Sequence, residues 1–302
     1  MTSDLTNSGE SGTVLRPLRE DDAEEVVELY RGAFGSERPI DAQEIVSWFQ
    51  NPELENEWLR VLEIEGRVVG YGDIWIDNDE VALEVASPGH WSPFFDWAEG
   101  RATADRLSRV RVFFPAGHEL ADLVEQRGYR LWRSAYTMHI ELGDLPPQEP
   151  RIPPGLELRR YRSGDSDALR AGLNEAFQGD PFFHEVTPSH FREFYLGGRG
   201  FDPSLWLVAW HGAELAGFIL TFPERAGDPT LAWVESLGVR LPWRRCGLGT
   251  ALLRAGFRGL HARGLRRVGL GVDTENETGA LRLYERAGMS VMRRGDNWVL
   301  DL

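Results

Sequence analysis

An internal repeat constrains this 302-residue chain more than any other feature of its sequence. Leu15-Arg16 and Ala33-Phe34 in the first half recur as Leu158-Arg159 and Ala176-Phe177, and 159 minus 16 and 177 minus 34 both give 143. Near the ends of the halves the offset is 160 throughout, because Leu123, Glu125, Gly128 and 140–142 match Leu283, Glu285, Gly288 and 300–302. A constant register at both ends predicts a duplicated domain, with insertions in the second copy. Chance similarity between two unrelated α+β domains is the alternative.

A proline-rich stretch at 143–155 separates the two copies. It predicts a stiff linker, because proline is disfavoured in helix interiors and central strands. We therefore expect a first domain at 13–142 and a second at 156–302, each of ordinary domain size. The polar, acidic residues 1–12 lack the basic and apolar regions of a signal peptide and predict a disordered tail.

Hydrophobic periodicity predicts the same order of elements in both copies and is clearest in the second. There the expected strands are 156–161, 206–210, 215–222, 231–239, 268–273 and 298–302, and the expected helices are 165–177, 247–263 and 278–287. The predicted fold class is α+β (mixed α/β). We expect two tandem domains of one fold, each a mixed, mostly antiparallel twisted sheet flanked by helices.

Composition excludes several classes of protein. No run of 18 or more apolar residues occurs, so we expect no membrane-spanning segment. The formal charge of −15 argues against nucleic acid as a partner and is compatible with a cationic substrate. The single cysteine, Cys246, excludes an internal disulfide, no histidine or cysteine spacing indicates a metal, and a reducing cytoplasm fits best. The chain has no lysine, which excludes a P-loop lysine and Schiff-base chemistry.

The segment 239–253 carries the strongest chemical signal. A strand ends, a proline-containing turn follows, and Gly247 and Gly249 open a helix. Free N–H groups at a helix N-terminus and the helix dipole attract anions, and Arg244 and Arg245 add two cations. This pattern predicts a pyrophosphate-binding loop. The dinucleotide-binding motif G-x-G-x-x-G fits poorly, because leucine occupies its third glycine position and a loop separates the strand from the glycines.

The loop and the residues that follow it resemble the signature of the GNAT superfamily of N-acetyltransferases. Arg244-x-x-Gly247-x-Gly249 resembles the family's R/Q-x-x-G-x-G/A motif. The family's later N-x-x-A-x-x-x-Y-x-x-x-G-F region is matched by Asn276, Ala280, Leu283-Tyr284-Glu285 and Gly288-Met289. The resemblance covers nearly all of 156–302 and implies a transferase that moves an acetyl group from acetyl-CoA to a primary amine of a small molecule by direct attack.

The first half resembles the family in outline only, and the tandem arrangement resembles the mycothiol-synthase-like branch. Three positions depart from the family pattern. Arg245 and Cys246 replace the more usual glycine and basic residue of the loop, so one cation has shifted position. Met289 replaces the usual phenylalanine, which exchanges one apolar residue for another.

The resemblance also implies roles for individual residues. Glu235 is at the position of a catalytic glutamate in polyamine-type members and is the expected general base, because at pH 7 only about one alkylamine in a thousand is unprotonated. Tyr284 is at the position of the acid that protonates the thiolate leaving group. A solvated strand residue and a helix residue packing on the sheet are the respective alternatives. The expected acetyl-CoA-binding residues are Leu237, Val239, Arg244, Arg245, Cys246, Gly247, Leu248, Gly249, Thr250 and Asn276.

The loop 177–184 lies where the family lines its acceptor pocket. Phe177, Asp180, Phe182 and His184 are the expected substrate-binding residues, and an ordinary polar turn is the alternative. The identity of the acceptor, the length of the acyl chain and the oligomeric state, monomer or homodimer, stay open. A non-catalytic protein that binds or sequesters acyl-CoA is the alternative function.

The first copy lacks the required chemistry at the matching positions. Arg244, Gly247 and Gly249 align with His90, Pro93 and Phe95, and Asn276 and Tyr284 align with Ala116 and Val124. Proline has no N–H to donate, and the bulky side chains would block the approach of a phosphate. We therefore expect the first domain to be degenerate and catalytically inactive, with the active site in the second.

Overall fold

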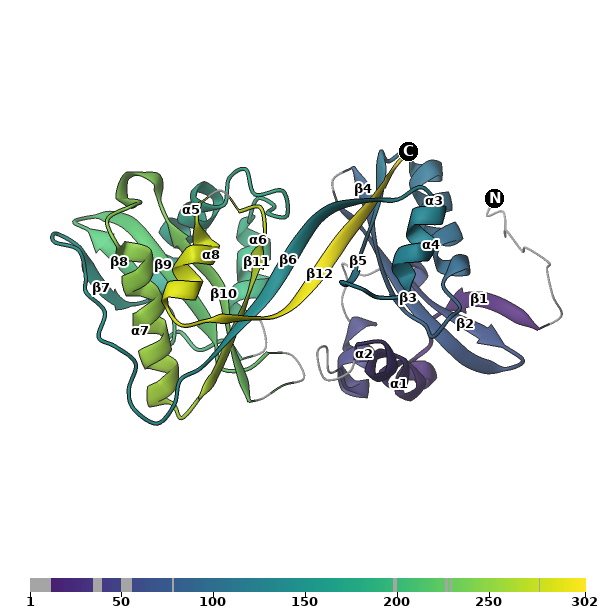
Figure 1. Ribbon diagram of the computed structural model, residues 1–302, viewed down its shortest axis with the longest axis horizontal. Coiled ribbons are helices and arrows are strands. Elements are labelled where there is room, and N and C mark those ends of the chain that lie inside the picture. Colours follow the sequence, from purple (N-terminus) through teal and green to yellow (C-terminus); the bar gives the residue numbers. More distant parts are fainter. Residues whose placement is uncertain are drawn as a thin grey trace. The chain divides into compact units, whose positions relative to one another are not determined.

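The computed structural model describes residues 12–34, 40–49, 56–77, 79–197, 200–225, 228, 230–276 and 278–302 (Figure 1). The chain divides into two compact units. Unit 1 comprises Met1–Arg133 with Gly295–Leu302, and unit 2 comprises Ser134–Arg294. The predicted N-terminal tail at 1–12 lies outside the described residues except for Gly12.

Unit 1 contains a sheet in the strand order β1-β2-β3-β4-β5-β12. Its pairs are antiparallel except for the parallel pair β4–β5. Its elements in chain order are β1 (Thr13–Pro17), α1 (Ala23–Phe34), α2 (Ala42–Trp48), β2 (Leu59–Ile64), β3 (Arg67–Asp77), β4 (Glu80–Ala86), α3 (Ser92–Asp105), β5 (Arg109–Pro115), α4 (Leu120–Gln126) and the start of β6 (Arg130–Glu141).

Unit 2 contains a sheet in the strand order β6-β11-β10-β9-β8-β7, with β10–β11 as its parallel pair. Its elements are the rest of β6, β7 (Glu157–Arg160), α5 (Ser166–Ala176), α6 (Pro188–His190), the π-helix η5 (Phe191–Leu196), β8 (Leu207–His211), β9 (Glu214–Phe222), β10 (Leu231–Val239), the 3₁₀ turn η6 (Leu241–Trp243), α7 (Leu248–Ala262), β11 (Arg267–Asp273), α8 (Ala280–Arg286) and the start of β12 (Ser290–Asp301). The predicted fold class, mixed and mostly antiparallel sheets with flanking helices, is confirmed.

The last strand is longer than its sequence predicts. β12 begins at Ser290, eight residues before the expected start at 298, and its first part is polar and charged. Arg293 donates from Nε to Thr137 Oγ1 at 3.0 Å, and Arg294 donates from Nε to Ser134 Oγ at 3.1 Å. Both acceptors lie on β6, within unit 2. These bonds allow a polar segment, which the sequence alone would indicate to be a loop, to form part of a strand.

The closing strands of the two sequence copies are exchanged between the units. In unit 2, β11 pairs with β6 from Arg267↔Glu141 to Asp273↔Ala135. In unit 1, β5 pairs with β12 from Arg109↔Asp301 to Pro115↔Gly295. The compact units are therefore divided within β6 and β12, and each sequence copy contributes a strand to the other unit's sheet. The stretch 143–155 contains no helix or strand, but it lies within unit 2, so the predicted linker does not divide the compact units.

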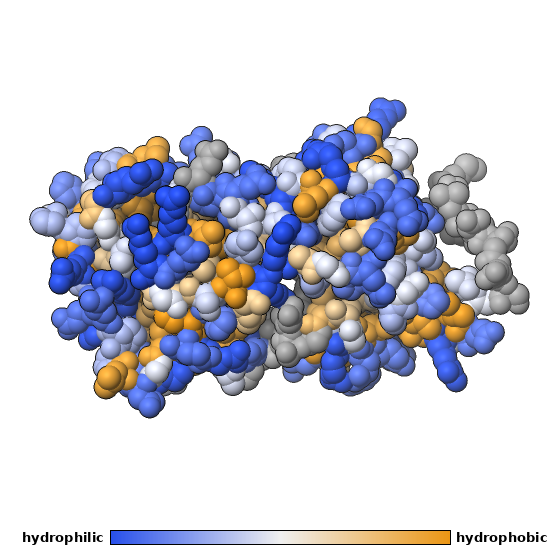
Figure 2. Space-filling view, in the orientation of Figure 1, coloured by the Kyte–Doolittle hydropathy of each residue, from blue (hydrophilic) through white to orange (hydrophobic). Residues whose placement is uncertain are grey.

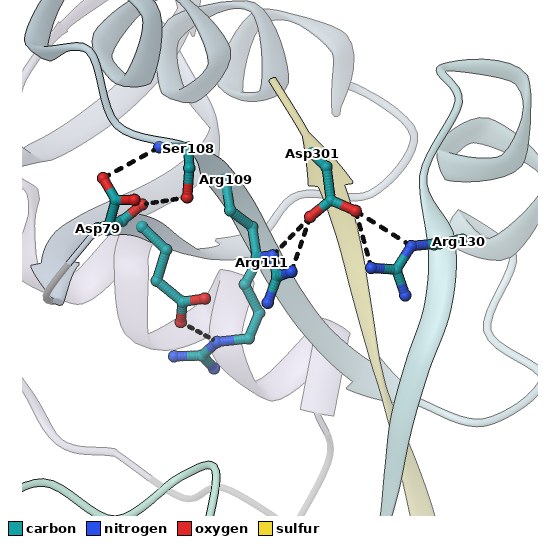
Figure 3. A network of polar contacts seen from close by, with 7 residues as sticks. Asp79, Ser108, Arg109, Arg111, Arg130 and Asp301 are labelled. Carbon is teal, nitrogen blue, oxygen red and sulfur yellow. Dashed lines mark hydrogen bonds and ion pairs between the residues drawn. The ribbon is translucent and has the colours of Figure 1, made fainter.

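Ion pairs anchor the exchanged strand β12 in unit 1 (Figure 3). The Asp301 carboxylate accepts from Arg109 Nε at 2.8 Å and from Arg130 Nη2 at 2.7 Å. The backbone N–H of Leu302 donates to the Ser108 carbonyl at 2.8 Å. Unit 2 repeats this arrangement, with Arg267 opposite Glu141 and the N–H of Leu142 bonded to Arg266. The identical register supports the duplication.

A second repeated contact closes the turn before the first helix of each copy. The Arg16 guanidinium binds the Asp22 carboxylate through two bonds of 2.7 and 2.8 Å, and Arg159 binds Asp165 through two bonds of the same lengths. Each aspartate also accepts the backbone N–H three residues earlier, at 2.8 Å. Because chance similarity would not reproduce the same three bonds at an offset of 143, the structure favours duplication over unrelated domains.

Two cores cover the two faces of the sheet in unit 2. Ala216 and Ile219 of β9 pack in the core beneath α7 and α8, whereas Phe218 and Leu220 of the same strand pack in the core beneath α5. Figure 2 shows hydrophilic residues over much of each unit's visible surface, with hydrophobic residues in small groups. Among the described residues, no helix is both long enough and apolar enough to cross a membrane.

Candidate functional site

The parallel strands β10 and β11 separate beyond their first residues. Their ladder runs only from Leu231↔Arg267 to Trp233↔Gly269, although β10 continues to Val239 and β11 to Asp273. The backbone edge of β10 that includes Leu237 and Val239 therefore has no β11 partner in the ladder. Such an edge can hydrogen-bond an extended ligand in place of a strand.

The loop after β10 delivers the N-terminus of α7 to this gap. Gly247 precedes the helix with φ +91°, a conformation that glycine adopts easily. A Cβ at Gly247 would meet no atom within 4 Å, so open space lies beside it. The N–H groups of Gly247, Leu248, Gly249 and Thr250 donate to no backbone carbonyl within the described part of the chain. The loop therefore presents a row of free donors to the gap, the arrangement that favours an anion.

Gly249 serves packing as well as the loop. A Cβ at Gly249 would lie 2.9 Å from Leu283 Cδ1 and 3.7 Å from Val239 Cγ2. The glycine thus allows α7 to approach α8 and the end of β10 closely. The space beside Gly249 is filled by protein, and the predicted contact of Gly249 with acetyl-CoA stays a prediction.

The basic residues of the loop have different surroundings. Arg244 donates from Nε to the Val239 carbonyl at 2.9 Å and from Nη2 to the Ala176 carbonyl at 3.0 Å. It therefore fastens the loop to β10 and α5. Arg245 is exposed and has φ +63°. The exposed thiol of Cys246 donates to the Trp243 carbonyl at 3.0 Å. Of the two predicted cations, Arg245 is the more exposed, and the binding of acetyl-CoA by either stays a prediction.

Glu235 is the extra residue of a β-bulge in β10. The register with β9 shifts between Val234 and Ser236, and bulges re-aim side chains next to active sites. The side chain is partly buried, and this burial raises the pKa of its carboxyl, an effect that the Arg225 guanidinium partly opposes. A carboxylate with a raised pKa is a stronger base than an ordinary glutamate.

Two neighbours of Glu235 are functional candidates that the sequence prediction missed. Tyr195 is a buried residue of the π-helix η5. Burial raises the pKa of its hydroxyl to about 12, the nearby Glu235 carboxylate raises the pKa further, and a hydrogen bond with Ser236 lowers it. The Arg225 guanidinium lies 3.9 Å from the centre of the Trp233 ring. The hydrogen bond of Tyr195 with Ser236 joins segments distant in sequence, so no local motif indicates it.

Tyr284 lies on α8 in the core that also contains Leu248, with Leu237 and Val239 packed against it. Burial raises the pKa of its hydroxyl to about 12, so the group is protonated at neutral pH. No hydrogen bond from this hydroxyl is found within the described part of the chain. The Tyr284 proton is therefore available to a ligand, and its place in the active site stays a prediction.

Asn276 caps the turn before α8. Its Oδ1 accepts the backbone N–H of Thr278 at 3.0 Å and also the Thr278 hydroxyl. Within the described part of the chain, the side-chain N–H groups of Asn276 make no hydrogen bond, so they are free for a ligand. The predicted role in holding a cofactor arm therefore stays a prediction that the local geometry permits.

The predicted acceptor loop at 177–184 is an ordered turn. The Asp180 carboxylate accepts the Phe182 N–H at 2.9 Å, and the rings of Phe177 and Phe183 stack at 5.3 Å. His184 is exposed. Asp180 thus fulfils the polar-turn alternative, and substrate binding by Phe177, Asp180, Phe182 and His184 stays a prediction.

Unit 1 has the same gap with different contents. In unit 1, Glu80 pairs with Arg109, the first residue of β5, and in unit 2, Leu231 pairs with Arg267, the first residue of β11. Glu84 follows Glu80 by four residues, as Glu235 follows Leu231, so Glu84 is the counterpart of Glu235. Tyr30 Oη donates to the Glu84 carboxylate at 2.5 Å, and Glu84 lies in a ladder without a bulge. Phe95 and Val124, aligned with Gly249 and Tyr284, are fully buried in the core of unit 1.

Comparison with known proteins places these features in a family. Residues 169–289 match the model of the acetyltransferase (GNAT) family. The chain is 31% identical to a mycothiol acetyltransferase of Streptomyces avermitilis over 308 residues, which cover 96% of each chain. It is 34% identical to that of Streptomyces scabiei over 235 residues, covering 76% of this chain and 75% of the relative. This chain belongs to the GNAT acetyltransferase family.

Solved structures agree with this assignment. A GCN5-related N-acetyltransferase from Sphaerobacter thermophilus superposes with a TM-score of 0.79 at 27% identity, covering 96% of this chain and 95% of that one. A tandem GNAT protein of the clavulanic acid biosynthesis pathway shares the fold, with a TM-score of 0.71 at 19% identity over 96% and 98% of the two chains. The protein is therefore an acetyltransferase with tandem GNAT domains, and the predicted resemblance is confirmed.

Proposed function

We propose that this GNAT acetyltransferase moves an acetyl group from acetyl-CoA to a primary amine of a small molecule, with its active site in unit 2. The observation that carries the proposal is the gap between β10 and β11, which has the free N–H groups of α7 at one end and Glu235 and Tyr284 beside it. The matching positions of unit 1 hold buried apolar side chains and a glutamate bonded to tyrosine. These contents support a single active copy.

The two halves of acetyl-CoA would meet different parts of the gap. Free donors at Gly247 to Thr250 and the positive end of the α7 dipole suit the pyrophosphate. The β10 edge at Leu237 and Val239 suits the amide-containing pantetheine arm and would polarise the thioester carbonyl. Asn276 would hold the arm from α8. The open space beside Gly247 and the accessible Arg245 support this assignment.

The reaction requires two proton transfers. Glu235 accepts a proton from the ammonium group, directly or through water, and the free amine attacks the thioester carbonyl. A C–N bond forms and the C–S bond breaks. Tyr284 donates its proton to the departing thiolate. The attacking nitrogen becomes positively charged and loses its second proton as the amide forms, and this proton returns to the tyrosine through water. Burial supports both roles, because it makes Glu235 a better base and keeps Tyr284 protonated.

The acceptor is proposed from the relatives. The two relatives described above are mycothiol acetyltransferases, so we infer that the acceptor is the amine from which acetylation forms mycothiol, or a close analogue. The formal charge of −15 suits a cationic amine.

CoA release from acetyl-CoA, measured with this amine and with a panel of other primary amines, tests the proposal. We expect turnover with at least one amine and product mass increased by one acetyl group. A protein that binds acetyl-CoA tightly but releases no CoA with any amine would instead be the non-catalytic binder.

A further inference from the structure

Unit 1 contains a cavity of about 360 Å³ that the proposed reaction does not use. It lies among one side of α1, the ends of β4 and β5, and the start of α4. This place corresponds to the acetyl-CoA gap of unit 2, because β4 and β5 separate after Leu83↔Val112 as β10 and β11 do after Trp233↔Gly269. Its volume is within the range of small-molecule sites.

The walls of the cavity are aromatic. Phe34, Trp91 and Phe114 line it together with the imidazole of His118. The His118 ring lies 6.1 Å from that of Trp91 and 5.9 Å from that of Phe114, which stacks on Trp298 at 6.0 Å. These contacts hold the aromatic faces in fixed positions around the cavity.

The charge around the cavity is negative. Glu25, Glu28 and Glu119 contribute to the lining, and no arginine does. Glu28 is paired with Arg31, whereas Glu25 and Glu119 are exposed and make no ion pair within the described part of the chain. The gap in unit 2 has Arg244 and Arg245 at its loop instead. Three carboxylates and no arginine disfavour a phosphate ligand and favour a cation.

His118 adds no positive charge at neutral pH. Its Nδ1 accepts the backbone N–H of Leu120 at 3.1 Å, so the ring proton is on Nε2. Burial lowers the pKa of the imidazole from its ordinary value, an effect that Glu119 partly opposes. The ring therefore acts as an aromatic wall with one N–H donor.

We propose that unit 1 binds a small organic cation in this cavity, with the apolar body between Trp91 and Phe114 and the ammonium group toward Glu25 and Glu119. An aromatic face attracts a cation through its quadrupole, and the carboxylates add direct attraction. The site is separate from the proposed active site, so the inference stands even if the proposed function fails. Its ligand belongs to the chemical class of the acceptor.

Benzyltrimethylammonium is a suitable probe, because its quaternary nitrogen cannot be acetylated. Benzyl alcohol and benzoate carry the same ring with a neutral and an anionic group. Calorimetry on the full chain should give one site for the cation, binding at least about tenfold weaker for benzyl alcohol, and no binding of benzoate. Equal affinity for benzoate and the cation would overturn the proposal.

Variants of unit 1 locate the site. Glu25→Gln with Glu119→Gln should weaken binding of the cation by about three- to tenfold and leave that of benzyl alcohol unchanged. The matched control is Glu24→Gln with Asp122→Asn, which makes the same change of charge on exposed positions of α1 and α4 outside the cavity lining and should alter nothing. An unchanged affinity in the first pair would overturn the proposal.

Trp91→Ala should weaken binding of the cation by about tenfold, and Trp91→Phe should restore most of it, because a ring is retained. If Trp91→Ala unfolds the protein, the Phe variant and the glutamate pair still decide the question. Turnover with saturating acetyl-CoA and amine should stay unchanged in all of these variants. A cation affinity that depends on Glu235 and not on Trp91 would place the probe in unit 2 and overturn the inference.

Discussion

At Glu235, the proposed general base, stability and activity can be tested with one substitution. Because burial raises the pKa of its carboxyl, the folded state binds this proton more tightly than the unfolded state. The stabilisation is present at low pH and is lost as pH rises through the raised pKa. We therefore expect Glu235→Gln to raise the melting temperature at neutral pH relative to the native protein, with a smaller difference near pH 4.

The same substitution should remove the acidic limb of the pH profile. In the native enzyme we expect kcat/KM to rise with pH through the pKa of the Glu235 carboxyl, with a midpoint above the ordinary glutamate value. Glu235→Gln should lower kcat/KM by about 10²- to 10⁴-fold and flatten that limb. A variant that keeps both the rate and the limb would identify Glu235 as a structural residue of the bulge.

Tyr284→Phe tests the proposed proton donor. The change removes one hydroxyl and little contact area, so the affinity for acetyl-CoA, measured by calorimetry, should stay within about twofold. Turnover should fall by about 10²- to 10⁴-fold, because the thiolate then leaves without a positioned acid. An unchanged turnover number, with the chemical step shown to be rate-limiting, would remove Tyr284 from the mechanism.

At the scale of elements, the N-terminus of α7 can be tested with a matched pair of glycines. Gly247 has φ +91° and Gly264, beyond the other end of the same helix, has φ +82°; a Cβ at either would meet no atom within 4 Å. Alanine should therefore cost each site about 1 kcal/mol of backbone strain. Only Gly247→Ala adds a methyl group to the proposed phosphate site, so it alone should weaken acetyl-CoA binding, by about tenfold or more in calorimetry. Equal effects of the two variants would place the pyrophosphate elsewhere.

Local signals explain which elements the sequence predicts well. The helices of unit 2 follow from apolar periodicity and capping glycines, so α7 was expected at 247–263 and lies at Leu248–Ala262. The loop at 244–249 can be predicted because a backbone with positive φ favours glycine, and glycines at the start of a helix form a recognisable local motif. The bulge at Glu235, the contact of Tyr195 with it and the occupation of Arg244 by carbonyls arise from tertiary packing, which no short motif encodes.

At the scale of the whole molecule, the exchange of closing strands escapes any local prediction. From the sequence, β6 and β12 could each complete the sheet of their own copy. Only the strand pairing shows that β6 pairs with β11 of the second copy and β12 with β5 of the first. The repeat in the sequence predicts a division at 143–155, whereas the compact units are divided within β6 and β12. The two sequence halves are therefore poor guides to which fragments can fold.

Two fragments that end at Arg294 test this consequence. A fragment of 156–294 lacks β6, which leaves the β11 edge exposed and removes Met138, fully buried in the core beneath α7. Truncating a single buried methionine costs about 2–5 kcal/mol, and a whole domain has only about 5–15 kcal/mol of stability. A fragment of 134–294 keeps most of β6 and contains all of unit 2.

We expect 134–294 to melt cooperatively by circular dichroism and to bind acetyl-CoA, and 156–294 to do neither. In the full chain, Met138→Ala should destabilise unit 2 although it lies in the first half of the sequence. If 156–294 folds and binds as well as 134–294, β6 is dispensable, and the boundary that the repeat predicts is the physical one.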